Sequence, residues 1–179
     1  MKLHRLEPFD EENSTVTVVI ETPSGSRNKY AWDEDESLFI LDGVLPSGAS
    51  FPFDFGFVPS TAGEGGDPLE ILVLMDAPAF PGCVVHVRVV GLIEAEETVK
   101  DETSRNDRVI GVAAESQLYR DVQELDDLAE PILEAMSRFF VSYHELRGKV
   151  FTPLGRFGPA RGLAAVQQGI QQARKKRKR

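Results

Sequence analysis

The sequence predicts an α+β protein that is mainly β, with a small β-barrel and two C-terminal α-helices packed on it. Three observations indicate this fold class. Short β-branched and apolar segments, bounded by turn residues, recur through residues 15–114. Helical periodicity appears only after residue 130, and no repeat or linker-like segment divides the 179 residues. The length suits one domain with a sizeable core.

Six segments rich in β-branched and apolar residues have strand character. They are residues 15–21, 28–32, 37–42, 69–75, 83–96 and 109–114. Proline and glycine interrupt residues 43–63 too often for a long regular element, and residues 97–108 are expected to form a polar loop. The four phenylalanines at 51, 53, 55 and 57 could stack nucleic-acid bases. Because no basic groove accompanies them, barrel core or a subunit contact is the preferred interpretation.

Two helices complete the predicted fold. The first begins at Glu130-Pro131, carries apolar residues at three- and four-residue spacing up to Leu146, and has Gly148 as a C-cap. The second runs from about Gly162 to the end of the chain. Its last six residues are all Arg or Lys, so the chain divides into one domain, residues 1–173, and a basic tip, residues 174–179. The tip complements the negative end of the helix dipole.

The charge distribution limits the possible partners. The chain has 20 Lys+Arg and 29 Asp+Glu; without the basic tip, 14 basic residues face 29 acidic ones, which leaves a charge of −15. An acidic body repels a phosphate backbone, so nucleic-acid binding by the domain is not expected. No apolar run approaches a membrane-spanning length, and the N-terminus lacks a signal-peptide core. The single cysteine, Cys83, excludes an internal disulfide, and we expect a buried thiol in a cytoplasmic protein.

The segment GEGGDPLEILV, residues 63–73, is the strongest candidate for chemistry. A flexible turn presents Asp67, a proline stiffens the backbone behind it, and Glu70 follows at the start of an apolar strand. Carboxylates mounted beside a rigid strand can bind hard cations such as Mg²⁺. From the pattern alone, a solvated acidic turn is the alternative.

Together with this segment, VVIETP, NKY, FPFDFGFVP, GGDPLEILV, VVGLIEAEE and RFFVSYHEL occur in an order and spacing that resemble the soluble family I inorganic pyrophosphatases. The resemblance covers about residues 14 to 150. It implies a five-stranded OB-like barrel with flanking helices, a homohexamer, and hydrolysis of pyrophosphate to two phosphates with Mg²⁺, for which Mn²⁺ is the alternative. In that reaction metal ions activate water and neutralise phosphoryl oxygens.

Five positions match the family's pattern. Asp67 stands where the resemblance implies the general base, and Lys29 and Tyr143 stand at phosphate-binding positions. Glu21 and Asp42 match two further residues of the site wall.

Other positions depart from the pattern by losing a functional group. Ala31 replaces a glutamate, Gly43 a phosphate-binding arginine, Phe55 a tyrosine and Gly65 an aspartate. His144 stands where the family has a lysine. Losing an arginine that clamps the transferred phosphoryl group removes several kcal/mol of transition-state stabilisation, by order of magnitude.

At the remaining positions that bind metal in the family, the side chain is different but still polar. Glu70 and Glu97 replace aspartates, which moves each carboxylate one methylene further out. In the loop Asn106-Asp107-Arg108, direct register gives Asn106 and Arg108 for the family's aspartate and lysine, while a one-residue shift would restore Asp107. The resemblance therefore implies Glu70, Glu97 and Asp107 as metal ligands and Arg108 as a phosphate-binding residue, with the loop register open.

These substitutions predict that Mg²⁺-dependent pyrophosphate hydrolysis is weak or lost, as in a pseudoenzyme. Nearby acidic residues could instead rebuild the metal cage; the candidates are Asp54, Glu64, Asp101 and Asp107. A second hypothesis is a non-catalytic binding or assembly protein that keeps the oligomer. A third is an OB-type nucleic-acid-binding module that uses the basic tip.

Overall fold

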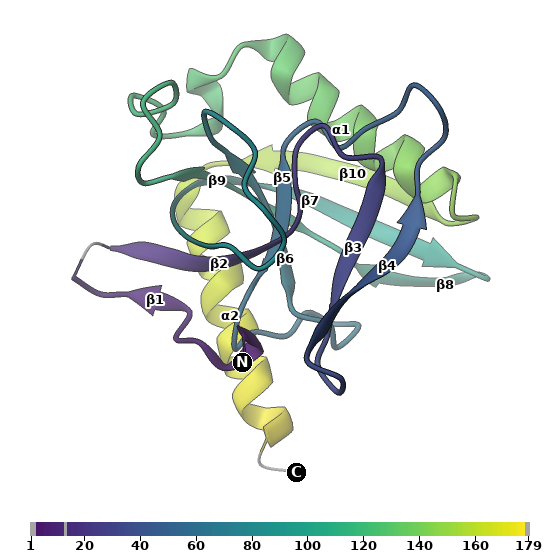
Figure 1. The fold of residues 1–179 in the computed structure, drawn as a ribbon, viewed down its shortest axis with the longest axis horizontal. Helices are drawn as coiled ribbons and strands as arrows, with labels where there is room; N and C mark the ends of the chain where they lie inside the picture. The colour runs from purple at the N-terminus through teal and green to yellow at the C-terminus, as the bar shows by residue number, and fades with distance from the viewer. Residues whose placement is uncertain (1–2, 13, 178–179) are drawn as a thin grey trace.

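The computed structural model describes residues 3–12 and 14–177 of the chain (Figure 1). An eight-stranded sheet has the order β1-β2-β5-β6-β9-β7-β10, with β8 also paired to β7. Its strands are β1 (Phe9–Asp10), β2 (Thr15–Thr22), β5 (Asp54–Val58), β6 (Leu69–Leu74), β7 (Val84–Val99), β8 (Glu102–Arg105), β9 (Arg108–Ala113) and β10 (Val150–Phe157). The α-helices are α1 (Glu130–Glu145) and α2 (Pro159–Arg177), and the 3-10 turns are Leu3–Arg5 and Leu125–Asp127.

A further pairing between β2 and β7 closes the sheet on itself. The ring β2-β5-β6-β9-β7 is a five-stranded barrel, which confirms the predicted fold class. Among the described strands, β6 and β9 form the parallel pair and the other pairs are antiparallel. Closure leaves no free edge along most of the ring.

Alternate residues of the barrel strands feed two hydrophobic cores. On β6, Leu72 and Leu74 belong to the core beneath α1, whereas Ile71 and Val73 belong to the core beneath α2. The two helices accordingly cover different sides of the barrel (Figure 1). Phe51, Phe55 and Phe57 are buried, so the expectation that they form core is confirmed.

The hairpin of β3 (Asn28–Asp33) and β4 (Leu38–Val44) forms a separate two-stranded sheet beside the barrel (Figure 1). Asp33 is the last residue of β3, and the acidic residues 34–36 lie in the turn. Several apolar side chains of β4 are exposed, among them Leu38, Ile40 and Leu41.

Several predicted boundaries were wrong. The segment 43–63 contains β5, because five consecutive residues are buried and paired with β6 despite the surrounding prolines. The predicted polar loop 97–108 contains the end of β7 and the whole of β8, while β1 and β10 were not predicted. Helix α1 begins at Glu130 as expected, but α2 begins at Pro159 rather than near Gly162.

The remaining expectations concern single residues and the chain ends. Cys83 is half-buried rather than buried. Residues 174–177 of the basic tip continue α2, and residues 178 and 179 lie outside the described part of the chain. Within the described ranges, no helix is long and apolar enough to cross a membrane.

Candidate active site

The nine residues that the resemblance assigns to a site come from seven parts of the fold. They are Glu21 on β2, Lys29 on β3, Asp42 on β4, Asp67 and Glu70 before and on β6, Glu97 on β7, Asp107 and Arg108 before and on β9, and Tyr143 on α1. Electrostatic interactions connect several of them. Burial first, and then the charge of Glu70, raise the pKa values of both Glu21 and Tyr143. These three side chains therefore share one charged region.

Lys29 and Glu21 form a buried ion pair, with 3.2 Å between Nζ and Oε2. The second oxygen of Glu21 accepts a hydrogen bond of 2.8 Å from the backbone N–H of Trp32. Lys29 also donates to the carbonyl oxygen of Tyr30 and lies 4.6 Å from the ring centroid of Phe55. The ammonium group is thus fully engaged by residues of the chain.

Arg108 is the largest fully buried side chain, with 2% of the residue exposed. Its guanidinium forms an ion pair of 2.6 Å with Glu70 and donates to the side chain of Asn106. The rings of Phe140 and Phe151 lie 5.0 and 5.4 Å away, within the range of a cation–π interaction. Burial among aromatic rings makes the Glu70 carboxylate the main counterion of this charge.

Glu97 lies beside a histidine and a lysine. His144 Nε2 lies 3.1 Å from its carboxylate, and Lys149 Nζ lies 3.2 Å from its other oxygen. His144 stacks on Phe151 and, through Nδ1, donates to the carbonyl oxygen of Phe140. Burial, followed by the nearby charge of Arg108, lowers the pKa of His144. Lys149 is therefore the permanent counterion of Glu97.

Asp42 and Tyr143 both contact Arg147. The guanidinium donates to the Asp42 carboxylate at 2.8 Å and to the Tyr143 hydroxyl at 2.6 Å. The hydrogen bond from Arg147 holds the pKa of Asp42 below its ordinary value. Sequence reasoning missed Arg147 and Lys149; the spacing of four residues from Tyr143 to Arg147 was a usable signal for the first.

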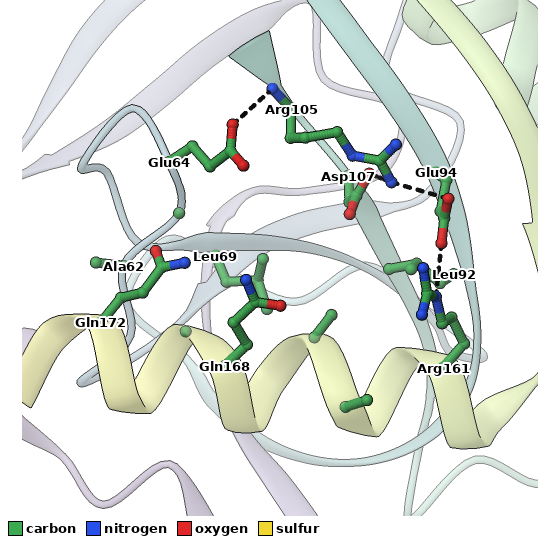
Figure 2. Close-up of a pocket in the computed structure, with 14 residues that line it drawn as sticks. Ala62, Glu64, Leu69, Leu92, Glu94, Arg105, Asp107, Arg161, Gln168 and Gln172 are labelled. Carbon is green, nitrogen blue, oxygen red and sulfur yellow. Dashed lines mark hydrogen bonds and ion pairs between the residues drawn. The ribbon is translucent and has the colours of Figure 1, made fainter.

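Asp107 and Asp67 lie apart from these pairs. Asp107 accepts from the backbone N–H of Ala95 and forms an ion pair of 2.9 Å with Arg105, on the wall of a pocket beside α2 (Figure 2). Asp67 is exposed, and among the described residues its carboxylate has no hydrogen-bond or ion-pair partner. In the folded chain, the side chain of Asn106 accepts a hydrogen bond from the guanidinium of Arg108.

The residues present do not fit a magnesium cage. Mg²⁺ requires several oxygen ligands in near-octahedral geometry at short distance. In the part of the chain that the structure describes, no three His, Cys, Asp or Glu side chains are grouped so that they could hold a metal ion. The rebuilt cage considered from the sequence is absent there too: Asp54 accepts from the N–H groups of Ser24 and Ala79, and Glu64 from that of Arg105.

Comparison with known proteins identifies the family of this fold. A sequence model described as "Inorganic pyrophosphatase" matches residues 18–175. A protein named inorganic pyrophosphatase from Synechocystis sp. is 40% identical over 155 residues, which cover 87% of this chain and 89% of the relative. Another, from Thermus thermophilus, is 44% identical over 140 residues, which cover 78% of each chain.

Solved structures agree. The crystal structure of inorganic pyrophosphatase from Thermus thermophilus superposes with a TM-score of 0.89 at 38% identity and covers 97% of this chain and 99% of its own. That of a type I inorganic pyrophosphatase from P. falciparum has a TM-score of 0.80 at 17% identity, and covers 97% of this chain and 62% of its own. At this low identity, the second match supports the fold only.

Proposed function

The chain belongs to the inorganic pyrophosphatase family, and we propose that it is a member in which Mg²⁺-dependent hydrolysis of pyrophosphate is weak or lost. One observation carries this proposal: the carboxylates at the family's positions are neutralised by cations of the chain. Arg108 pairs with Glu70, Lys149 pairs with Glu97, and Lys29 pairs with Glu21. A metal ion would have to displace these partners before it could bind.

The energetic cost of that displacement is highest at Arg108. Removing its carboxylate partner would leave a charge in an environment that is 2% exposed, and uncompensated buried charges cost several kcal/mol, by order of magnitude. Bound metal ions would supply an activated water and charge neutralisation. The chain's own cations supply part of the neutralisation, but without the metal ions the activation of water would depend on a general base alone.

The substituted positions support the same proposal. In this family member Asp67 would be the general base, Lys29, Arg108 and Tyr143 would contact phosphate, and Glu70, Glu97 and Asp107 would be the metal ligands. Asp107 faces Arg105 instead of the other two carboxylates. At Gly43 and Gly65, where the family pattern has an arginine and an aspartate, there is no side chain to take part.

Isothermal titration with MgCl₂, MnCl₂ and sodium pyrophosphate tests this proposal. We expect no saturable Mg²⁺ binding at concentrations below about 1 mM, with or without pyrophosphate. Saturable binding of two or more Mg²⁺ ions per chain would contradict it. Parallel titration of the Glu97→Gln variant controls for non-specific binding to the acidic surface, because that variant keeps the surface charge outside the site.

A second candidate function is a non-catalytic assembly or binding protein, a homohexamer by resemblance. Large apolar side chains exposed on the isolated chain favour assembly; they include Leu38, Leu41, Val44, Phe80, Leu118, Leu146 and Val150. Contiguous exposed apolar surface marks interaction sites. Sedimentation analysis should give the mass of a hexamer, and a monomer at micromolar concentration would contradict this candidate. A cytoplasmic location remains a prediction from the sequence.

A further inference from the structure

The polar pocket that Asp107 lines lies between α2 and the barrel, with a cavity of about 260 Å³ (Figure 2). Leu69 and Leu92 form apolar parts of its lining, and Gln168 and Gln172 line it from the helix. Leu92 belongs to the core beneath α2, whereas its neighbour Ile93 belongs to the core beneath α1. Because side chains alternate along a strand, Glu94 faces this pocket while Glu97 points to the opposite face of β7. Of the nine residues assigned to the candidate active site, Asp107 alone lines this pocket.

Four charged residues of alternating sign follow one wall of the pocket (Figure 2). Glu64 accepts a hydrogen bond from the backbone N–H of Arg105, and the Arg105 guanidinium forms an ion pair of 2.9 Å with Glu94. The other oxygen of Glu94 forms an ion pair of 2.6 Å with Arg161 of α2. Glu94 is buried between the two arginines, and the hydrogen bond from Arg105 lowers its pKa. Each carboxylate oxygen of Glu94, at the centre of this series, therefore has an arginine partner.

The two ends of the series, Glu64 and Arg161, are exposed and can be reached by a ligand. Among the described residues, the second carboxylate oxygen of Glu64 and the terminal guanidinium nitrogens of Arg161 have no hydrogen-bond partner, and neither does the amide of Gln168. One end of the pocket thus presents an exposed carboxylate oxygen of Glu64, and the other presents the exposed guanidinium edge of Arg161. Figure 2 places Glu64 and Arg161 on opposite sides of the pocket, with Gln168 between them on the helix.

We propose that this pocket binds a small zwitterion that carries an ammonium and a carboxylate group on a short hydrocarbon chain, as a free amino acid does. The ammonium would lie against Glu64 and the carboxylate would accept the paired N–H groups of Arg161, the geometry in which arginine binds carboxylates most strongly. The hydrocarbon chain would cover Leu69 and Leu92. Gln168 can donate to one ligand group and accept from the other.

The remaining wall residues argue against ligands with a single charge. Glu64, Glu94 and Asp107 would repel a phosphate or other polyanion, and Arg105 and Arg161 would repel a divalent cation. A ligand with both charges avoids each conflict. The loop wall is also held in place, because in the orientation that satisfies its amide Gln172 donates to the carbonyl oxygens of Ala62 and Gly63. A pre-formed wall reduces the ordering cost of binding.

A series of ω-amino acids tests the proposal: glycine, β-alanine, 4-aminobutyrate and 6-aminohexanoate, titrated into the full chain by calorimetry and ligand-observed NMR. Hexanoate and hexylamine provide the matched single charges. At least one zwitterion should bind saturably with a millimolar or lower Kd, and both singly charged compounds should bind at least about tenfold more weakly. Absence of saturable binding by every zwitterion would overturn the proposal, as would equal binding of the single charges.

Two substitutions locate the binding. Arg161→Gln and Glu64→Gln each remove one terminal charge while keeping a polar side chain, and each should weaken binding about tenfold or more. Arg161→Lys, which keeps the charge, should lose less. Arg138→Gln and Glu134→Gln are the matched controls, since they alter an exposed ion pair on α1, and neither should affect binding. Binding that survives both pocket substitutions would place the ligand elsewhere and refute the assignment. The result does not depend on pyrophosphate hydrolysis, which is measured separately.

Discussion

The guanidinium of Arg108 forms an ion pair of 2.6 Å with the carboxylate of Glu70. The resemblance assigns Glu70 to a metal and Arg108 to a phosphate, yet in the folded chain each is the partner of the other. The arginine is buried beside the rings of Phe140 and Phe151, where water does not compete for it. The pair therefore neutralises both charges inside the folded chain, and a metal ion at Glu70 would have to displace Arg108.

The stability of this pair can be measured directly. Glu70→Gln keeps the size of the side chain but leaves the buried Arg108 charge without its counterion, so the free energy of unfolding should fall by about 2 kcal/mol. The control Glu134→Gln breaks an exposed pair of similar length with Arg138 and should change it by less than about 0.5 kcal/mol. Urea unfolding monitored by circular dichroism gives both values. Equal losses would show that Arg108 does not depend on Glu70.

Restoring the family's side chains should restore hydrolysis. A Cβ atom added at Gly43 or Gly65 would meet no atom within 4 Å, so the backbone has room for Gly43→Arg and Gly65→Asp. Combined with Glu70→Asp, Glu97→Asp and Asn106→Asp, these changes should raise kcat/KM for pyrophosphate with Mg²⁺ by about 100-fold or more over the starting protein. Steady-state phosphate release measures the gain.

A matched variant separates function from backbone effects. Gly43→Ala with Gly65→Ala fills the same space without adding a charged group, and it should leave both stability and phosphate release unchanged. If the variant with these five changes folds but binds no Mg²⁺, the substitutions at these five positions do not explain the proposed loss of hydrolysis.

Close packing of α2 on the barrel should make Gly162 intolerant of any side chain. A Cβ atom there would lie 2.6 Å from Val89 Cγ1 and 2.8 Å from the carbonyl oxygen of Gly91. In a helix Gly→Ala normally stabilises by up to about 1 kcal/mol. Here overpacking should reverse the sign, and Gly162→Ala should destabilise by about 2 kcal/mol in urea unfolding. Gly65→Ala, with open space around it, is the control. A stabilised Gly162→Ala variant would mean that α2 sits further from β7.

The charged wall beside α2 should contribute to acid sensitivity. The hydrogen bond from Arg105 holds the pKa of Glu94 below its ordinary value of 4.5. As the pH falls below about 4.5 the unfolded chain takes up a proton that the folded chain resists, so this contribution to stability is present above that pH and is lost below it. The free energy of unfolding of Glu94→Gln should therefore depend less on pH between about pH 5 and about pH 3. An unchanged slope would show that Glu94 titrates normally.

Much of the fold follows from local patterns, but β5 and β10 do not. The five residues of β5 lie between prolines, and their strand is defined by pairing with β2 and β6. Gly56 permits that pairing, since a Cβ there would lie 2.1 Å from the carbonyl oxygen of Val19. Strand β10 contains Pro153, which is compatible with an edge strand. In the sequence alone, this proline predicts the end of a strand.

The sequence predicted which positions belong to the candidate site, but it did not predict which of their side chains contact one another. Sequence reasoning identified Glu70, Glu97 and Arg108 together. Their pairing depends on Lys149, beyond the end of α1, and on aromatic residues from α1 and β10, which tertiary packing alone brings together. The orientation of Asp107 likewise depends on the backbone N–H of Ala95 on β7, which is distant in sequence, as well as on the nearby Arg105.

Phosphate release from pyrophosphate by the purified chain, with Mg²⁺ or Mn²⁺ and beside the Thermus thermophilus relative under the same conditions, tests the central claim most directly. We predict a turnover at least about 1,000-fold below that of the relative, because the metal positions are paired internally. Turnover in the range of ordinary enzymes, about 1 to 1,000 per second, would contradict the account.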